Sequence, residues 1–357
     1  MEEKRERAIL VGLALKSGLQ NNIEELKALA EAAGAEVITT LIQSRERAHA
    51  GTYIGKGKLE ELIHLIQELQ PEVIIFDSEL SPTQIRRLEE VIDVKIIDRT
   101  MLILDIFSQR ARSSEGKLQV ELARLQYRLP RLTGKGAEMS RLGAGIGTRG
   151  AGEQKLEMDR RYIRKRIQDI KKRMEKAEST RALHRSQRQR AGLKAVSLVG
   201  YTNAGKSSLF NALCSATHRS GTAQVEADQR LFQTLDTTIR KINLSSKKAI
   251  LLSDTVGFIQ NLPHHLIAAF RSTLEEAAEA DLLLHVVDIS DPDHLEKIEV
   301  VEGVLRDLGA DSERILKVFN KVDCLDIYPD NGGKSIFLSA KTGQGLDKLL
   351  ARLGDEL

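Results

Sequence analysis

Eight residues, GYTNAGKS at 200–207, combine two glycines with a lysine and a serine in a spacing suited to phosphate binding. The glycines let backbone N–H groups curl around a phosphate, and the start of the helix that follows adds partial positive charge. Lys206 is expected to bridge the β- and γ-phosphates of a nucleotide, and the Ser207 hydroxyl to coordinate Mg²⁺. The apolar run KAVSLV at 194–199 precedes these residues. The sequence therefore predicts a phosphate-binding loop between a strand and a helix.

A second motif, NKVD at 320–323, follows the apolar run RILKVF at 314–319 and so stands at the carboxyl end of a predicted strand. Ligands of open α/β sheets bind at such strand ends. Asp323 is able to accept two hydrogen bonds from guanine, at its ring N–H and at its exocyclic amine. Adenine lacks both donors and would leave the carboxylate desolvated and unpaired. The motif therefore favours a guanine nucleotide, GTP or GDP, over ATP.

The residues around Asp323 complete the predicted base site. Asn320 would brace the loop, and the stem of Lys321 would cover one face of the base. The segment SAK at 339–341 follows the apolar run SIFL. Its central backbone N–H, that of Ala340, would donate to the carbonyl oxygen of guanine.

Two segments between these motifs fit the parts of a nucleotide hydrolase that sense the terminal phosphate. DTVG at 254–257 begins at the end of the apolar run AILLSD, which places the Asp254 carboxylate near the water shell of a bound metal. The Gly257 N–H would reach the γ-phosphate. LFQTLDTT at 231–238 holds three threonines where such proteins keep a flexible switch, although these also fit ordinary loop or strand positions. The four motifs occur in the order of a translation-factor-type G domain.

The residue after DTVG is Phe258, at a position where many such enzymes carry a Gln that orients the attacking water. A phenyl ring neither donates nor accepts a hydrogen bond. Hydrolysis by the protein alone is therefore predicted to be slow, at ~10⁻⁴–10⁻² s⁻¹, until a partner orders the switches or supplies a polar group. His264 and His265 follow closely, but histidines at an exposed helix start are more often without a catalytic role.

The first hundred residues alternate β-rich runs with helical runs, the pattern of a small parallel sheet covered by helices. The predicted strands are AILVGL (8–13), EVITTLI (36–42), EVIIFD (72–77) and VKIID (94–98). The predicted helices are LQNNIEELKALAEAAG (19–34), KLEELIHLIQELQ (58–70) and SPTQIRRLEEVI (81–92). Ser81 and Pro82 are a typical N-cap and first helical residue.

Within this part of the chain, TYIGKGKLEEL at 52–62 places two glycines and two lysines just before a helix. Since helix N-termini attract anions, the stretch is a candidate second phosphate-binding turn. Glycine is common in turns, however, and a plain junction between a loop and a helix is the preferred interpretation.

Two long helical stretches flank a glycine-rich loop at 134–152, which has 7 glycines among its 19 residues. Apolar residues recur at heptad-like spacing, at Leu118, Leu122, Leu125 and Leu129 in the first stretch and at Ile163, Ile167, Ile170, Met174 and Ala177 in the second. Such seams predict an antiparallel helical hairpin, with Pro130 ending the first helix.

The charge is concentrated in this hairpin. Residues 159–190 carry 13 Lys and Arg against 4 Asp and Glu, although the whole chain has a net charge of only +3. This favours contact with a polyanion, the alternative being a solvated helix face. A mobile loop with Lys135, Arg141 and Arg149 on a stiff arm suits a folded RNA, the alternative being a flexible connector. With 5 Tyr, 8 Phe and no Trp, a surface of stacked aromatic rings is not expected.

Composition narrows the class of protein further. The 357 residues fit two or three domains. No run of ~18 apolar residues occurs and the opening MEEKRER is charged, so neither a membrane span nor a signal peptide is expected. Cys214 and Cys324 lack metal-ligand spacing, which indicates reduced thiols in a cytoplasmic protein.

Nearly the whole chain resembles the HflX-type ribosome-associated GTPases, which are related to the translation-factor P-loop GTPases. The resemblance rests on TYIGKGKLEEL, DRTMLILDIFSQRARSSEGKLQVELARLQYRLPRL, GAGIGTRGAGEQKLEMDRR, GYTNAGKSSLFNAL and DTVGFIQNLPHHLIAAFRSTLEE. It implies an α/β fold with an N-terminal α/β subdomain at 1–100, a long helical hairpin at 101–192 and a Ras-like G domain at 193–357. It also implies hydrolysis of GTP to GDP with Mg²⁺, binding of a monomer to the large ribosomal subunit and its rRNA, and splitting or rescue of stalled ribosomes.

By position, the resemblance assigns Thr234 as the switch threonine that binds Mg²⁺ alongside Ser207. It makes Lys206, Thr234 and Gly257 the residues that act on the terminal phosphate. The predicted nucleotide-binding residues are Gly200, Tyr201, Thr202, Asn203, Ala204, Gly205, Lys206, Ser207, Ser208, Phe232, Gln233, Thr234, Leu235, Asp236, Asp254, Thr255, Val256, Gly257, Asn320, Lys321, Val322, Asp323, Ser339, Ala340 and Lys341.

The chain departs from the family pattern in three places. The family's G-P-G-E-T is GAGEQ at 150–154, which removes a rigid proline from the loop, and its L-D-P-T is LDTT at 235–238. Many members carry a further small domain after the G domain, whereas this sequence ends at Leu357. The family places an apolar residue after DTVG, so Phe258 agrees with it.

The leading hypothesis is a GTP-dependent ribosome-binding switch whose arm competes for functional rRNA and whose hydrolysis releases the protein. One alternative is a GTP-sensing RNA or protein adaptor with incidental hydrolysis, with which Phe258 is compatible. Another is a nucleotide-driven RNA-remodelling enzyme with a second, ATP-binding site in the N-terminal domain. The NKVD motif argues against ATP at the main site but does not bear on a second site.

Overall fold

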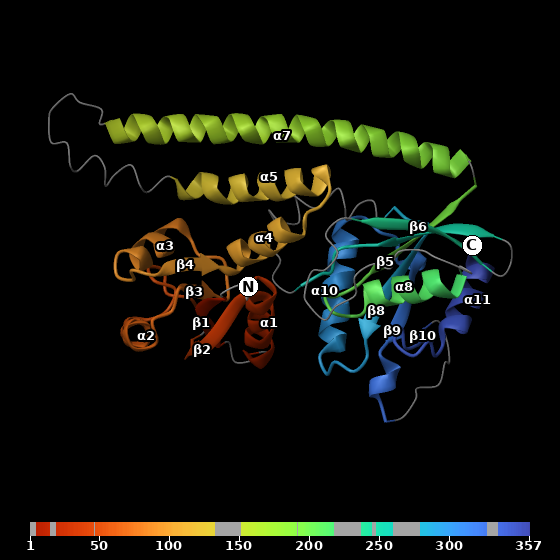
Figure 1. Ribbon diagram of the computed structural model, residues 1–357, viewed down its shortest axis with the longest axis horizontal. Helices are drawn as coiled ribbons and strands as arrows, with labels where there is room; N and C mark the ends of the chain where they lie inside the picture. Colours follow the sequence, from red (N-terminus) through yellow and green to blue (C-terminus); the bar gives the residue numbers. More distant parts are fainter. Residues whose placement is uncertain are drawn as a thin grey trace. The chain divides into compact units, whose positions relative to one another are not determined.

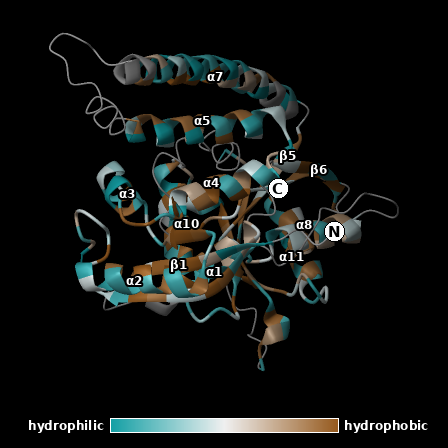
Figure 2. Cartoon of the chain, turned by 60° about the vertical axis from the view of Figure 1, so that its left-hand side comes forward, coloured by the Kyte–Doolittle hydropathy of each residue, from teal (hydrophilic) through white to brown (hydrophobic). Residues whose placement is uncertain are grey.

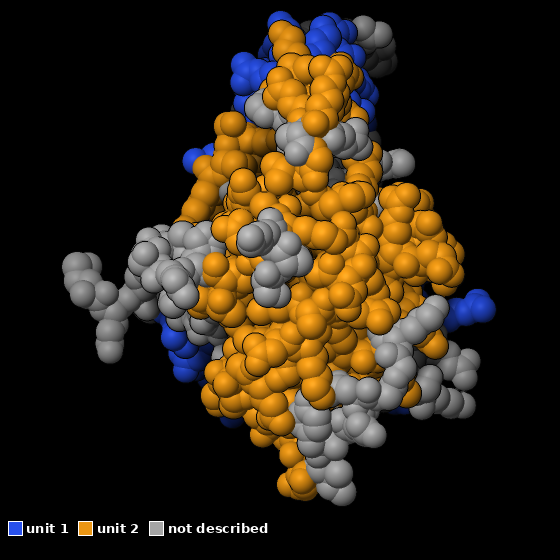
Figure 3. All heavy atoms as spheres, turned by 90° about the vertical axis from the view of Figure 1, so that its right-hand side faces the viewer, with its two compact units in different colours: residues 1–109, 117–174, 263–266 blue, residues 110–116, 175–262, 267–357 orange. Residues whose placement is uncertain are grey.

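The computed structural model describes residues 5–14, 19–45, 47–132, 151–190, 192–217, 237–244, 248–259, 279–326 and 335–357. The chain divides into two compact units, residues 1–109, 117–174 and 263–266 in one, and residues 110–116, 175–262 and 267–357 in the other (Figure 3). No helix within the described segments combines the length and the apolar run that crossing a membrane requires.

The first unit contains the predicted small parallel sheet. Its strands, β1 (Glu6–Ala14), β2 (Ala35–Ser44), β3 (Val73–Phe76) and β4 (Lys95–Asp98), pair in the order β2-β1-β3-β4, all parallel (Figure 1). The connecting helices are α1 (Leu19–Ala32), α2 (Lys56–Leu69) and α3 (Pro82–Glu89). Ile9, Val11, Ile74 and Phe76 are fully buried in the core. The sheet carries apolar side chains on both faces, as strands joined by crossover helices must.

Helix α3 begins as its sequence predicts. The Ser81 hydroxyl accepts from the Gln84 backbone N–H at 3.2 Å, and the Gln84 side chain accepts from the Ser81 N–H at 2.9 Å. Pro82 takes the first helical position, where no backbone N–H is required.

Helix α4 (Arg99–Arg110) leads into the hairpin formed by α5 (Ser114–Arg131) and α7 (Ala151–Arg190). Figures 1 and 2 both show α5 and α7 side by side. Arg166 donates to both carboxylate oxygens of Glu121, at 2.7 and 2.8 Å, and Arg181 pairs with Glu115 at 2.7 Å. Since the later residue of α7 meets the earlier residue of α5, the helices are antiparallel, as the heptad spacing predicts.

The apolar seams of the hairpin are buried or half-buried in both helices, with Ile163 and Ile170 almost fully enclosed. The prediction that Pro130 ends the first helix is wrong by one residue. The helix continues to Arg131, and Pro130 lies in its last turn. A proline there removes a single backbone hydrogen bond, which a helix end tolerates better than its middle does.

The second unit is built on a six-stranded sheet in the order β10-β9-β8-β5-β7-β6. The strands are β5 (Lys194–Val199), β6 (Thr238–Asn243), β7 (Ala249–Asp254), β8 (Leu282–Asp288), β9 (Ile315–Asn320) and β10 (Ile336–Phe337). Among these described strands, β6 alone runs antiparallel to its neighbour. The helical segments are α8 (Lys206–Thr217), α10 (His294–Asp307), η1 (Ser312–Arg314), η2 (Val322–Cys324) and α11 (Leu346–Glu356).

This sheet places three of the predicted motifs along one edge. β5 and β7 are adjacent and parallel, and β8 and β9 continue the sheet on the other side of β5. The carboxyl ends of β5, β7 and β9 therefore meet at the same edge. They carry GYTNAGKS, DTVG and NKVD respectively.

Candidate functional site: a nucleotide site at the sheet edge

The loop between β5 and α8 holds a shape that requires glycine at position 205. Gly205 has φ +88°, and a Cβ built there would lie 2.2 Å from Nδ2 of Asn320. Asn203 has φ +61°, a conformation that Asn adopts more readily than most residues. The loop thus curls back on itself beside the NKVD segment, with the first turn of α8 directly behind it.

Lys206 lies deep in this loop and is 6 % exposed. Its Nζ donates to the carbonyl oxygens of Gly200 at 3.0 Å and Tyr201 at 2.8 Å. Burial lowers the pKa of Lys206 to about 8, although the charge of Asp254 opposes this shift. Gly257 passes so close that a Cβ there would meet Lys206 Nζ at 3.0 Å and Thr202 Cγ2 at 2.8 Å. Glycine at this position therefore lets DTVG approach the lysine.

The lowered pKa of Lys206 predicts that nucleotide binding takes up protons in mildly alkaline solution. Phosphates favour the charged ammonium, so binding should raise the pKa of Lys206 back toward its usual range. With a free pKa of about 8, GDP binding should take up about 0.7 proton at pH 8.5 and about 0.1 at pH 7. Affinity should accordingly fall as pH rises above 8.

Isothermal titration calorimetry of GDP binding in two buffers of different ionisation enthalpy measures this proton uptake directly. The measurement at pH 7 is the control within the same protein. A binding enthalpy that does not depend on the buffer at pH 8.5 would contradict the lowered pKa.

Ser207 and Asp254 are brought together as predicted from their motifs. The Ser207 hydroxyl donates to Oδ2 of Asp254 at 2.7 Å, and Asp254 is fully buried at the end of β7. A hydroxyl and a carboxylate are hard oxygen donors of the kind that Mg²⁺ prefers, directly or through water. The pair therefore fits a magnesium ion, and its present hydrogen bond shows how closely the two groups converge.

The Phe258 backbone pairs with the phosphate-binding loop. Its N–H donates to the Gly200 carbonyl at 3.1 Å, and its carbonyl accepts from the Thr202 N–H at 2.7 Å. The phenyl ring is buried, at 3 % exposed. Both the absence of a polar side-chain group and this burial leave attacking water without an orienting partner at position 258. No sequence signal indicates the backbone pairing, because it depends on main-chain atoms alone.

Asn320 links the base-recognition loop to the phosphate-binding loop. Its Nδ2 donates to the Ala204 carbonyl at 2.9 Å, and its Oδ1 accepts from the Ala340 N–H at 2.9 Å. The first contact is the brace expected of Asn320. The second differs from the expectation for Ala340, whose N–H is directed at Asn320, so a guanine carbonyl would have to share or take over that donor.

Asp323 lies at the surface in η2, and its carboxylate has no hydrogen-bond partner among the described residues. An exposed, unengaged carboxylate at this edge suits the two donors of guanine. Lys321 precedes it with φ +66°, and its ammonium pairs with Asp288 at the end of β8. That pairing holds the lysine stem in place beside the loop.

Other predicted site residues hold the edge together. Thr255 and Val256 are buried, and the Thr255 hydroxyl donates to the Leu198 carbonyl at 2.6 Å. Ser339 is fully buried, and its hydroxyl accepts from the Thr342 N–H at 3.1 Å. Phe232, Gln233, Thr234, Leu235 and Asp236, together with His264 and His265, lie outside the described residues.

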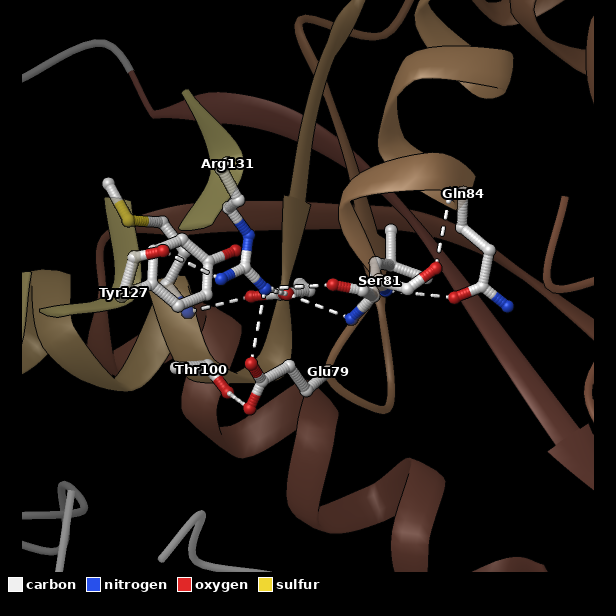
Figure 4. A network of polar contacts seen from close by, with 9 residues as sticks. Glu79, Ser81, Gln84, Thr100, Tyr127 and Arg131 are labelled. Carbon is white, nitrogen blue, oxygen red and sulfur yellow. Dashed lines mark hydrogen bonds and ion pairs between the residues drawn. The ribbon is translucent and has the colours of Figure 1, made fainter. Parts of the chain in front are cut away.

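A second polar cluster, which sequence reasoning missed, fixes the end of α5 to the first unit (Figure 4). Arg131 Nη2 donates to the Leu80 carbonyl at 2.8 Å and lies 3.2 Å from Glu79 and 3.4 Å from Asp98. Its guanidinium stacks 3.3 Å above the ring of Tyr127. Asp98 is 1 % exposed, and burial raises the pKa of its carboxyl. The last turn of α5 is thus held directly before the loop at 134–152.

Removing this anchor should destabilise the protein. Arg131→Ala would leave the buried Asp98 without its cation, and loss of one partner of a buried pair typically costs about 3 kcal/mol or more. Arg131→Lys should recover part of this, because it keeps the charge but not the planar fork. Chemical denaturation measures the change.

Lys95→Ala is the matched control, since the ion pair of Lys95 with Glu6 is half-exposed at both ends. Exposed pairs contribute at most about 1 kcal/mol. Equal losses for Arg131→Ala and Lys95→Ala would show that the cluster adds no stability beyond that of a surface pair.

Comparison with known proteins agrees with this architecture. Family models match residues 20–108 (GTP-binding GTPase N-terminal), 110–188 (GTP-binding GTPase Middle Region) and 195–321 (50S ribosome-binding GTPase). A GTP-binding protein from Sulfolobus solfataricus, solved in complex with GDP, shares the fold, with a TM-score of 0.50 and 24 % identity over 98 % of both chains.

Two named relatives are more similar in sequence. The GTPase HflX of Caldanaerobacter subterraneus subsp. tengcongensis is 53 % identical over 99 % of this chain and 81 % of its own. The GTPase HflX of Escherichia coli is 42 % identical over 99 % of this chain and 83 % of its own. The resemblance seen in the motifs is confirmed, and the chain belongs to the HflX family of GTPases.

Proposed function

We propose that this GTPase is a switch that docks on the large ribosomal subunit in its GTP form and splits or rescues ribosomes. The observation that carries the proposal is the match of residues 195–321, which include the phosphate-binding loop, DTVG and the first two residues of NKVD, to the 50S ribosome-binding GTPase model. Ribosomes lie in the cytoplasm, so we place the protein there. We also expect it to act as a monomer.

In this proposal the nucleotide binds at the edge formed by β5, β7 and β9. Lys206 would contact the β- and γ-phosphates, while Ser207 and Asp254 would hold Mg²⁺, directly or through water. When bound, Mg²⁺ would supply positive charge against the phosphate oxygens. Gly257 would offer its N–H to the γ-phosphate, and Thr234 would be a further ligand of the metal. Asp323 selects guanine.

GTP binding would also act on Phe258. The Thr202 N–H that now binds the Phe258 carbonyl belongs to the loop that must surround the phosphates. Seating a γ-phosphate between Lys206 and Gly257 requires these segments to separate, because the space beside Gly257 is filled by Lys206 and Thr202. Nucleotide state is thereby coupled to the position of the segment that begins at Phe258.

The helical arm is proposed to contact rRNA. Along α7, Arg164, Lys165, Lys171, Lys172 and Arg173 are exposed. Clustered exposed cations attract the phosphates of RNA, and the adjoining loop at 134–152 adds three more basic residues. Docking would bring this arm to functional rRNA. It would also stimulate hydrolysis, which would then depend on the ribosome.

The second, ATP-binding site in the N-terminal domain gains no support from the contacts at the GKGK turn. The Gly55 N–H donates to Oε1 of Gln43 at 2.8 Å, and Lys58 pairs with Glu61 at 2.9 Å. The Gly55 N–H and the Lys58 ammonium are thus engaged within the chain. These contacts favour the interpretation of a junction between a loop and a helix.

Subunit dissociation tests the proposed function against the adaptor alternative. Intact ribosomes mixed with the protein and a non-hydrolysable GTP analogue should separate into subunits, as with GTP, while GDP should give little separation. Light scattering follows the reaction. Tight binding without dissociation in either GTP or the analogue would support the adaptor instead.

A further inference from the structure

One side of α7 carries two large apolar side chains in water. Tyr162 is 69 % exposed and Met158 is 64 % exposed, whereas Ile163 and Ile170 of the same helix are buried. Residues four apart in a helix are neighbours on its surface, so Met158 and Tyr162 form one patch. Figure 2 shows that α7 is mainly hydrophilic, and among its described residues Leu183, at 59 % exposed, is the other large apolar side chain that is strongly exposed.

Positive charge lies beside the patch on the side of Tyr162. Lys165 lies three residues after Tyr162 and therefore beside it on the helix surface, with Lys172 and Arg173 two further turns along the same side. Within the described part of the chain, neither Lys165 nor Lys172 forms an ion pair with another residue. Arg161, in contrast, is paired with Glu157 at 3.4 Å. Asp169 lies between Lys165 and Lys172 on this side of the helix, so Lys165, Lys172 and Arg173 leave the side that bears Tyr162 with an excess of positive charge.

A flat aromatic ring beside unpaired cations suits a nucleic acid with an unpaired base. The cations attract a polyanion backbone, and the ring offers a face on which a nucleobase stacks. A protein or lipid partner would be expected to meet a broader apolar surface than two side chains. Phosphate contact alone would need neither the tyrosine nor the methionine.

We propose that Tyr162 is a stacking platform for an unpaired nucleobase of RNA, with Met158 covering the edge of the base and Lys165 contacting the adjoining phosphate. The inference deepens the proposed function and rests on it, because it names the chemistry by which the arm reads rRNA. It is compatible with the expectation, drawn from the scarcity of aromatic residues, that the protein has no surface built of many stacked aromatic rings. One exposed ring is sufficient to stack a single unpaired base.

The absence of tryptophan from the sequence allows a direct test. Tyr162→Trp keeps a stacking ring and makes it the only tryptophan. Leu183→Trp, at another exposed apolar position of α7, is the matched control. The probes are a protein-free transcript of large-subunit rRNA and heparin, a polyanion without bases. Tryptophan fluorescence at position 162 should be quenched by the transcript and not by heparin, and at position 183 by neither.

Affinity for the same transcript supplies the second measurement. Tyr162→Ala should weaken binding by about fivefold to a hundredfold, the range found for loss of one stacked base, while leaving the salt dependence unchanged because tyrosine is neutral. Tyr162→Phe should restore the affinity and Tyr162→Leu should not. Replacing Lys165, Lys172 and Arg173 with Ala should reduce the salt dependence instead. Thermal unfolding checks that each variant is folded.

The outcomes separate this inference from the proposed function. If the unaltered protein binds the transcript but Tyr162→Ala binds equally well, or if Leu serves as well as Phe, the stacking platform is wrong and the ribosomal function stands. Quenching by heparin as strong as by RNA would also overturn it. If the unaltered protein binds neither the transcript nor intact large subunits, the proposed function fails and takes the inference with it.

Discussion

Single-turnover hydrolysis of GTP is expected to be slow for the protein alone, at ~10⁻⁴–10⁻² s⁻¹, and to rise by several orders of magnitude with purified large ribosomal subunits. The physical reason lies at Phe258. Its ring has no hydrogen-bonding group and is 3 % exposed, and its backbone is paired with Gly200 and Thr202. Attacking water has nothing to orient it there until a partner rearranges this segment or contributes a polar group.

The experiment compares the protein alone, with large subunits and with small subunits, under an excess of enzyme over GTP. Lys206→Ala is the control that should remove activity in all three conditions, because it removes the cation between the phosphates. Fast hydrolysis without subunits would show that the protein orders its own water and that the argument from Phe258 is wrong. Slow hydrolysis in every condition would favour the adaptor.

Helices, strands and turns that are determined by residues adjacent in the sequence were predictable. β5 and β7 run over the residues expected, because an apolar run before a glycine-rich motif leaves few other assignments. The capping box at Ser81 and the antiparallel hairpin of α5 and α7 follow from local signals of the same kind. Motif order then placed Lys206, Asp254 and Asn320 at one edge, since carboxyl ends of parallel strands meet there.

Contacts between residues far apart in the sequence were not predictable. Arg131 donates to the carbonyl of Leu80, 51 positions earlier, and stacks on Tyr127 of its own helix. No pattern in the sequence around Arg131 or Leu80 indicates that these two residues meet. The Phe258 backbone bridge and the donation of Ala340 to Asn320 use main-chain atoms, which every residue possesses.

Asp323→Asn should change the base that the protein accepts. The variant loses the carboxylate that receives two donors of guanine, which corresponds to about 3–6 kcal/mol, or roughly 10²- to 10⁴-fold weaker binding of GTP. Xanthine presents a carbonyl where guanine has its amine, and the Asn amide is able to donate to it. Xanthosine triphosphate should therefore bind the variant better than GTP does.

Asp326→Asn is the matched control, because Asp326 is an exposed acid three residues along the same loop and should leave GTP binding unchanged. Competition against a fluorescent GDP analogue measures both variants. Unaltered GTP affinity of Asp323→Asn would contradict the assignment of the base site, and ATP use that persisted unchanged would point to a second nucleotide site.

The change of base also separates nucleotide binding from the stimulation of hydrolysis by the ribosome. The Asp323→Asn variant with xanthosine triphosphate retains Lys206, Phe258 and the helical arm. If large subunits stimulate its hydrolysis of xanthosine triphosphate as they stimulate the original enzyme with GTP, the ribosome acts on the switch segments, and the base serves only to admit the nucleotide.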